Sequence, residues 1–249
     1  MPKFFVNQDQ IQDDKIIITG QDVKHIKKVL RAKIGEVLEI CNIVSNENYL
    51  CNITKIENEE IECTIKQNLE TEAESNIQVT IFQGLPKADK MEYIIQKSVE
   101  IGGYDITPVE MKRCVVKLDE KDKVKRVIRW QKISEVAAKQ CGRDIIPKIN
   151  NIINIKKLCE LIKNYDIVLL AYEKEKENTL KEQLKNIKEM NENKIKIGIV
   201  IGPEGGIEEQ EVKSLQENGV KVITLGKRIL RTETVALNVL SIIMYELEN

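Results

Sequence analysis

Two glycine-containing segments in the C-terminal third carry residue types suited to ligand binding. The apolar run Ile195–Ile201 leads into GPEGG at 202–206, and the run Val222–Leu225 leads into GKRILRTET at 226–234. Glycines at the end of a buried parallel strand let a ligand approach the backbone closely. The free amides of the next helix N-terminus then bind its polar groups. Neither segment is a GxGxxG or P-loop motif, so the pattern does not favour NAD or ATP.

The second segment also places cations beside an apolar helix. Val235–Leu247 is apolar nearly all round, which predicts burial in the core or against a second subunit. Arg228 and Arg231 precede it, and their charge is costly to desolvate unless it meets carboxylate, phosphate or solvent. The simpler alternatives are an ordinary strand-to-helix turn at 202–206 and a helix capped by Thr232 or Thr234.

Composition excludes several classes of protein. The 249 residues are 42% apolar and 32% charged, enough for a buried core. With 39 basic and 40 acidic residues the formal charge is -1, so any nucleic-acid contact must come from local patches. Six cysteines without a CxxC pair and a single histidine predict no metal site and no Ser-His-Asp triad. The lack of a signal peptide or an apolar run of membrane-spanning length predicts a cytoplasmic protein without a membrane partner.

The residues up to 69 form short strands around one predicted helix, Asp22–Arg31. Such closely spaced strands favour a small β-barrel. The predicted strands are Lys15–Thr19, Glu36–Val44, Tyr49–Glu57 and Glu60–Leu69. The polar segment ETEAESN at 70–76 then marks a domain boundary.

From Ile77 onward the pattern alternates between strands and helices, which predicts an α/β domain with a parallel sheet. The predicted strands are Val79–Phe82, Ile106–Val109, Ile167–Ala171, Ile195–Ile201 and Lys221–Leu225. The predicted helices are Lys90–Ile101, Lys125–Gln140, Glu208–Glu217 and Val235–Leu247, with a solvated, helical, Lys- and Glu-rich surface over Glu173–Lys196.

The IGPEGG and LGKRILRTETVAL segments, at 201–206 and 225–237, resemble the ribosomal RNA small subunit methyltransferase E family of the SPOUT class. The resemblance spans nearly the whole chain. It includes HIKKVLR at 25–31, KADKMEYIIQKSVEIG at 87–102, WQKI at 130–133 and AAKQCGRDIIP at 137–147.

The resemblance implies a PUA-like β-barrel RNA-binding domain at 1–72. It also implies a SPOUT α/β methyltransferase domain at 73–249, with a C-terminal trefoil knot. The activity implied is methylation of N3 of uracil 1498 in 16S ribosomal RNA of the small subunit, with S-adenosyl-L-methionine as methyl donor. A homodimer packed through the knotted domain is also implied, which would give the apolar face of Val235–Leu247 a partner.

Carried over by position, the implied cofactor site lies among three loops. Its residues are Tyr172, Ile201, Gly202, Pro203, Glu204, Gly205, Leu225, Gly226, Ile229, Leu230, Arg231 and Thr232. The adenine is expected to lie against backbone groups, with Ile201, Leu225, Ile229 and Leu230 as apolar walls.

Three residues are candidates for the catalytic step. Uracil N3 carries a proton, so Arg231 or Arg228 would stabilise the uracil anion, or Glu233 would take the proton as a base. The sequence does not choose between these roles. It also leaves open that Glu204 binds a ribose hydroxyl or caps its own loop, and that Glu233 pairs with Arg231.

Basic residues within the matched motifs are candidates for RNA contact, because arginine and lysine neutralise phosphates. They are His25, Lys28, Arg31, Lys87, Lys90, Lys97, Arg113 and Arg143. For any single lysine a solvated surface charge is the simpler reading, and His25 is equally expected to pack beneath the barrel.

Two other functions stay open at the level of sequence. One is a non-catalytic RNA-binding or ribosome assembly factor that kept the fold, although the intact RTET run argues against it. The other is a methyltransferase of the same class that acts on a ribose 2′-hydroxyl, although QKSVEIG at 96–102 and QCGR at 140–143 favour base modification.

Overall fold

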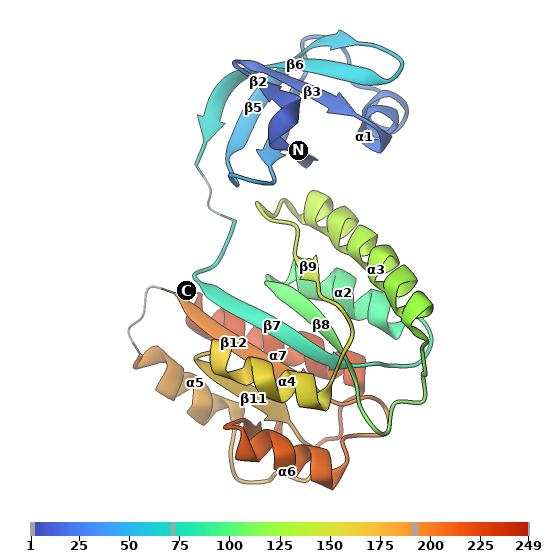
Figure 1. Ribbon diagram of the computed structural model, residues 1–249. Coiled ribbons are helices and arrows are strands. Elements are labelled where there is room, and N and C mark those ends of the chain that lie inside the picture. Colours follow the sequence, from blue (N-terminus) through green and yellow to red (C-terminus); the bar gives the residue numbers. More distant parts are fainter. Residues whose placement is uncertain (1–2, 71–72, 191–193, 249) are drawn as a thin grey trace. The chain divides into compact units, whose positions relative to one another are not determined.

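The chain folds into two compact units (Figure 1). The computed structural model describes residues 3–70, 73–190 and 194–248. Unit 1 comprises Met1–Glu74 and Ala138–Ile146, and unit 2 comprises Ser75–Ala137 and Pro147–Asn249. The predicted boundary after residue 72 falls on a residue outside the described ranges. Unit 1 also takes in a second, distant segment that the sequence did not indicate.

Unit 1 is a six-stranded sheet in the order β1-β4-β5-β6-β3-β2. All neighbours are antiparallel except β1 and β4, which are parallel. The strands are β1 (Lys3–Val6), β2 (Ile11–Gln12), β3 (Lys15–Thr19), β4 (Val37–Asn42), β5 (Asn48–Ile56) and β6 (Glu60–Leu69), with η1 (Gln8–Gln10) before β2. The four predicted strands are confirmed within two residues at each end, whereas β1 and β2 were not predicted.

The predicted helix Asp22–Arg31 is divided into two parts. A short α1 (Gln21–Lys24) continues as the π-helical turn η2 (His25–Leu30). Arg31 ends it in the left-handed conformation, at φ 55°, and the Ala32 amide donates to the Ile26 carbonyl oxygen at 3.1 Å. Val23 and Ile26 are buried, so the apolar stripe was correctly assigned although the helix type was not.

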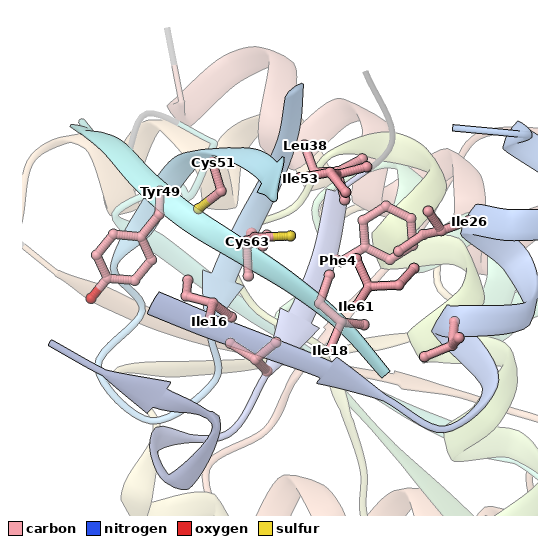
Figure 2. Packing of buried hydrophobic residues seen from close by; sticks show 13 residues of the cluster. Phe4, Ile16, Ile18, Ile26, Leu38, Tyr49, Cys51, Ile53, Ile61 and Cys63 are labelled. Carbon is pink, nitrogen blue, oxygen red and sulfur yellow. The ribbon is translucent and has the colours of Figure 1, made fainter. Parts of the chain in front are cut away.

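The core of unit 1 gathers side chains from one face of five strands, as Figure 2 shows. Alternate residues enter it, such as Ile16 and Ile18 on β3 and Ile61 and Cys63 on β6, as the two-residue period of a strand requires. A single cluster can collect residues from all these strands only if the sheet curls around it, in agreement with the predicted barrel. Burial raises the pKa of the Cys63 thiol to about 12, so this cysteine acts as an apolar residue.

A buried polar network joins the 138–146 segment to the strands of unit 1. Asp144 accepts hydrogen bonds from Lys3, from the Asn48 side chain at 2.6 Å and from the Ala73 amide at 3.1 Å. Burial by itself lowers the pKa of Lys3, but hydrogen bonds to Asp144 and Glu39 raise it by more. Lys3 therefore remains charged inside unit 1, neutralised by two carboxylates.

Unit 2 is an α/β domain with a fully parallel sheet in the order β10-β8-β7-β12-β11-β13, and β9 pairs with β8. The strands are β7 (Ile77–Gly84), β8 (Asp105–Glu110), β9 (Lys148–Ile149), β10 (Ile153–Asn154), β11 (Ile167–Ala171), β12 (Ile195–Ile201) and β13 (Lys221–Ile223). The predicted bounds of β11 and β12 are confirmed. β11 is a continuous apolar run, and β12 is apolar except for the exposed Lys196 near its start, as strands largely covered on both faces require.

The helices of unit 2 largely follow the predicted segments. They are α2 (Lys90–Glu100), α3 (Glu120–Cys141), α4 (Ile155–Leu161) with η3 (Ile162–Asn164), α5 (Leu180–Lys188), α6 (Glu209–Glu217) and α7 (Thr232–Leu247). The solvated surface predicted over Glu173–Lys196 contains α5 only, with residues 191–193 outside the described ranges, and α4 was not predicted. The apolar α7 packs on α2, and among the described residues no helix has the length and apolar character needed to cross a membrane.

We predict that Asp144→Ala lowers the free energy of unfolding by about 3 kcal/mol, because it leaves the buried Lys3 ammonium with one of its two carboxylates. Urea denaturation of the full chain measures the loss. Hydrogen exchange should place the faster opening in unit 1. The exposed Asp14→Ala is the matched control and should change stability by less than about 0.5 kcal/mol. Equal effects of the two substitutions would contradict a stabilising role for the Asp144 network.

Candidate active site

The two glycine-containing segments meet at one edge of the parallel sheet. β12 and β13 both pair with β11 in parallel, so the carboxyl ends of all three strands lie at the same edge. The Tyr172 amide, just after β11, donates to the Ile223 carbonyl oxygen at 3.1 Å. The loops that follow the three strands together line a cavity of about 510 Å³, which lies within the usual size range of small-molecule sites.

All twelve residues proposed from sequence for the cofactor line this cavity. Arg228 and Lys90 also line it, although Lys90 was predicted to contact RNA. The lining residues that the sequence did not single out are Ala171, Glu173, Gly206, Ile207, Thr224, Lys227 and Val235. Each of these lies within three positions of a predicted cofactor residue in the chain, so extending each loop by up to three positions would have found it.

Glycine is required at two positions of the loops. Gly226 has φ 99°, a conformation that is strained for residues with a Cβ. Gly205 lies so close to Arg113 that an added Cβ would be 3.0 Å from the Arg113 carbonyl oxygen. The Arg113 guanidinium in turn donates to the Gly205 carbonyl oxygen at 3.3 Å, so this predicted RNA residue also contacts the 202–206 loop.

A buried hydroxyl joins the two loops to the centre of the sheet. Thr232 Oγ1 donates to the Gly202 carbonyl oxygen at 2.7 Å and accepts from Gln83 Nε2 at 2.8 Å. Gln83 is fully buried near the end of β7. The ends of β7 and β12 and the start of α7 therefore meet at one side chain. The sequence analysis missed Gln83, whose only indication was a polar side chain in a strand that is buried throughout.

Lys90 bridges the two loops at the rim of the cavity. Its ammonium lies 3.0 Å from Glu204 Oε1 and 3.1 Å from Glu233 Oε2, and these bonds raise the pKa of Lys90. Partial burial raises the pKa of Glu204, but hydrogen bonds from backbone amides and from Lys90 lower it by more, so its pKa is below the ordinary value. Glu233 therefore pairs with Lys90, and the alternative pairing with Arg231 is not observed.

Arg228 and Arg231 line the cavity as exposed cations. Within the described ranges neither forms a salt bridge, in contrast to Lys90. Glu233 lies on the other side of the start of α7, in a groove with Tyr93 and Leu237. Lys227 and Glu173, which are also exposed in the lining, likewise form no salt bridge with a described residue. The cavity thus presents three unpaired cations and one unpaired carboxylate, while the predicted base Glu233 is held in an ion pair.

The remaining predicted RNA residues are dispersed. His25, Lys28 and Arg31 are exposed on unit 1, and the His25 ring contacts the Phe4 ring edge-on at 6.1 Å between centroids. On unit 2, Lys87 is exposed, with its backbone amide donating to Glu204 at 3.1 Å. Lys97 is half-buried and paired with Glu100 at 2.8 Å.

Arg143 does not fit the predicted RNA contact. Its side chain is 7% exposed and pairs with Glu74 at 2.6 Å within unit 1. A buried guanidinium held in this way stabilises the fold and is not available to phosphates. The QCGR sequence around Arg143 does not indicate that its side chain is buried.

The cavity combines apolar walls, backbone polar groups from three loops and three exposed cations, Lys227, Arg228 and Arg231. Such a site suits a ligand with a neutral heterocycle and polar substituents, next to a group that develops negative charge. Among the described residues, no three or more His, Cys, Asp or Glu side chains are placed to hold a metal ion.

Comparison with known proteins agrees with this architecture. Residues 73–244 match the model of an RNA methyltransferase domain, and residues 18–66 match that of an RNA methyltransferase PUA domain. The ribosomal RNA small subunit methyltransferase E of Bacillus subtilis is 34% identical, over 100% of this chain and 98% of its own. That of Mesomycoplasma hyopneumoniae is 36% identical, over 97% of this chain and 98% of its own. The chain belongs to the ribosomal RNA small subunit methyltransferase E family.

Solved structures of this family share the whole fold. The Neisseria gonorrhoeae ribosomal RNA small subunit methyltransferase E, bound to S-adenosyl methionine, is 28% identical with a TM-score of 0.85, covering 98% of this chain and 97% of its own. A Legionella pneumophila putative methyltransferase in complex with the same cofactor is 26% identical, also with a TM-score of 0.85, covering 98% of this chain and 96% of its own. The fold of this family member is therefore compatible with binding of that molecule.

We predict that Thr232→Val lowers the free energy of unfolding by about 1–3 kcal/mol, because it leaves the Gln83 amide and the Gly202 carbonyl without their shared partner. Thermal unfolding measures the loss. Thr234→Val, an exposed threonine two residues along the same helix, is the matched control and should have no comparable effect. If both valine variants had the same thermal unfolding midpoint as the unsubstituted protein, the stabilising link between the loops would be refuted.

Proposed function

We propose that this protein transfers a methyl group from S-adenosyl-L-methionine to N3 of uracil 1498 in 16S ribosomal RNA of the small subunit. The observation that carries the proposal is the single cavity lined by the loops after β11, β12 and β13, which holds all the residues expected to bind the cofactor. Two structural relatives over nearly the full chain are bound to S-adenosyl methionine, which supports the same ligand here.

The lining of the cavity fits this cofactor. Ile201 and Leu225 come from neighbouring segments and provide apolar walls for an adenine ring, while Gly202 and Gly226 give a ligand access to backbone groups. Ile229 is 86% exposed and extends the apolar wall at the entrance. When bound, the cofactor supplies an electrophilic methyl group on sulfonium, so the residues of the chain serve mainly to orient the two reactants.

The cations of the cavity favour stabilisation of the uracil anion over base catalysis by Glu233. Uracil N3 becomes nucleophilic when its proton is lost to solvent water, and a nearby positive charge stabilises the resulting anion. Arg228 and Arg231 are exposed at the cavity and free of salt bridges to the described residues, whereas Glu233 is engaged by Lys90. We assign the electrostatic role to Arg231, assisted by Arg228, and a positioning role to Glu233.

RNA is proposed to contact both units. On unit 1, which includes the match to the PUA model, His25, Lys28 and Arg31 are exposed on or beside η2. On unit 2, Lys87 and Arg113 are exposed beside the 202–206 loop. The phosphates of a folded RNA would meet these groups, in a cytoplasmic setting where small subunits are available.

The knotted topology and the homodimer belong to the same proposal. The residues after β13 lead into α7, and its Thr232 forms hydrogen bonds with Gln83 and Gly202, which supports passage of the chain end beside the 202–206 loop. α7 leaves Tyr245 74% exposed, and Tyr93 of α2 is 47% exposed beside the groove that follows α7. A second copy would cover these aromatic side chains, and light scattering should then give twice the mass of one chain.

Methylation of small subunits from a strain that lacks this modification tests the proposed function. Calorimetry should first show binding of S-adenosyl-L-methionine, and mass spectrometry of the RNA should then place the methyl group on the base of uracil 1498. A methyl group on the ribose would indicate a 2′-hydroxyl methyltransferase. RNA binding without cofactor binding or transfer would indicate an assembly factor.

We predict that Arg231→Ala lowers the methylation rate at saturating substrate by about 100-fold, the usual effect of removing one group that stabilises developing charge. Glu233→Gln should lower it by less than about tenfold, because the glutamine keeps the size of the side chain and an amide oxygen facing the Lys90 ammonium. Rates under single-turnover conditions from pH 6 to 9 measure both. If Glu233→Gln abolished the transfer and removed the dependence of the wild-type rate on pH, the base role would belong to Glu233 instead.

A further inference from the structure

A row of cations runs along the exposed face of α3 in unit 2. Lys121, Lys125, Arg129 and Lys132 follow one another at intervals of four, four and three residues, which places them on one face of the helix. All four are exposed. The row, here called the α3 ridge, spans about 16 Å along the helix axis, long enough to follow several phosphates of an RNA strand.

The charge of α3 is unlike that of an ordinary solvated helix. α3 carries seven Lys or Arg against three Asp or Glu, while the whole chain has a formal charge of -1. Two of the three acids, Glu120 and Asp122, are in the first turn, where the helix dipole favours negative charge. The middle of the helix therefore presents a positive surface, and an exposed helix stabilised by its own ion pairs would instead alternate in sign.

The salt bridges of the ridge leave much of its charge available. Arg129 pairs with Glu92 of α2 at 2.7 Å but keeps its side chain 67% exposed. Lys125 contacts Asp122 at 3.6 Å, and both side chains are more than half exposed. Lys121 and Lys132 form no salt bridge with any described residue. The ridge thus has four cations and no carboxylate close enough to neutralise its two ends.

A groove lies between the ridge and the start of α2. Its charged lining consists of Lys125, Arg126 and Arg129 together with Asp89, Glu92 and Asp122, and Ala88 lies beside them. Ala88 and Asp89 directly precede Lys90, which lines the cofactor cavity. A strand that lies along the ridge and continues past the start of α2 would reach the rim of the cavity within the same compact unit.

We propose that the α3 ridge is a docking surface for the phosphate backbone of the substrate RNA, which holds the strand that flanks the target nucleotide. This inference rests on the proposed RNA methyltransferase function and extends it to a helix without an assigned role. The charge complementarity selects RNA as the occupant, because a surface with four exposed cations in a row attracts a polyanion and repels other basic surfaces.

The test compares two double charge reversals in the full-length protein. Lys121→Glu with Lys132→Glu removes the two unpaired ends of the ridge. Lys181→Glu with Lys185→Glu makes the same change in charge on the exposed face of α5, where neither lysine forms a salt bridge with a described residue. Binding to unmethylated small subunits is measured from 50 to 300 mM salt, together with calorimetry of S-adenosyl-L-methionine and circular dichroism.

The ridge variant should bind the subunit at least tenfold more weakly at moderate salt. The slope of log affinity against log salt should fall by about 1.4–1.8, which corresponds to two lost phosphate contacts. The α5 variant should bind within threefold of the unsubstituted protein, and both variants should retain the cofactor affinity and the fold.

Equal binding by the two variants would overturn the role of the ridge while leaving the proposed function intact. A comparable loss of binding in both variants would also overturn it, since it would show an effect of net charge alone. If the unsubstituted protein itself failed to methylate the subunit, the proposed function would fail, and that result is visible separately from the comparison of the variants.

Discussion

The Thr232 hydroxyl is the contact on which the arrangement of the site depends. It accepts from the buried Gln83 amide and donates to the Gly202 carbonyl oxygen, so a single side chain ties the start of α7 to the ends of β7 and β12. The Gln83 and Thr232 side chains are buried, and the Thr232 hydroxyl would lose both partners if the strands or α7 moved apart. The glycine loops are therefore held at a fixed separation, and a cavity remains between them.

A second layer of interactions holds the same loops from the rim. Lys90 lies between Glu204 of one loop and Glu233 at the start of α7, and its ammonium forms an ion pair with each carboxylate. The charged side chains of the cavity without such a partner among the described residues are Lys227, Arg228, Arg231 and Glu173, so its unpaired charge is mainly cationic. Lys90, which has carboxylate partners, holds the loops together. Arg228 and Arg231, which have none among the described residues, are available to a ligand.

Outside the cavity, basic residues that look equivalent in the sequence differ in burial and in their partners. Arg143 and Lys132 are both basic residues near the centre of the chain, but Arg143 is buried against Glu74 whereas Lys132 is exposed on α3. A nearly neutral chain can thus still present a strongly positive face, because many acidic side chains lie at helix N-termini or in ion pairs with other basic residues. On unit 2, the α3 ridge is such a positive face.

The sequence by itself determined the two kinds of domain, the bounds of β11 and β12, and the loops that line the cavity, because periodicity and glycine position are local properties of the chain. It missed α4 and the π-helical turn η2, whose local signals are weak. Only the tertiary structure decided that Gln83 meets Thr232, that Lys90 faces two carboxylates, and that Arg143 is buried. Those contacts join residues far apart in the chain, and no local pattern records which distant groups the packing of a parallel sheet brings together.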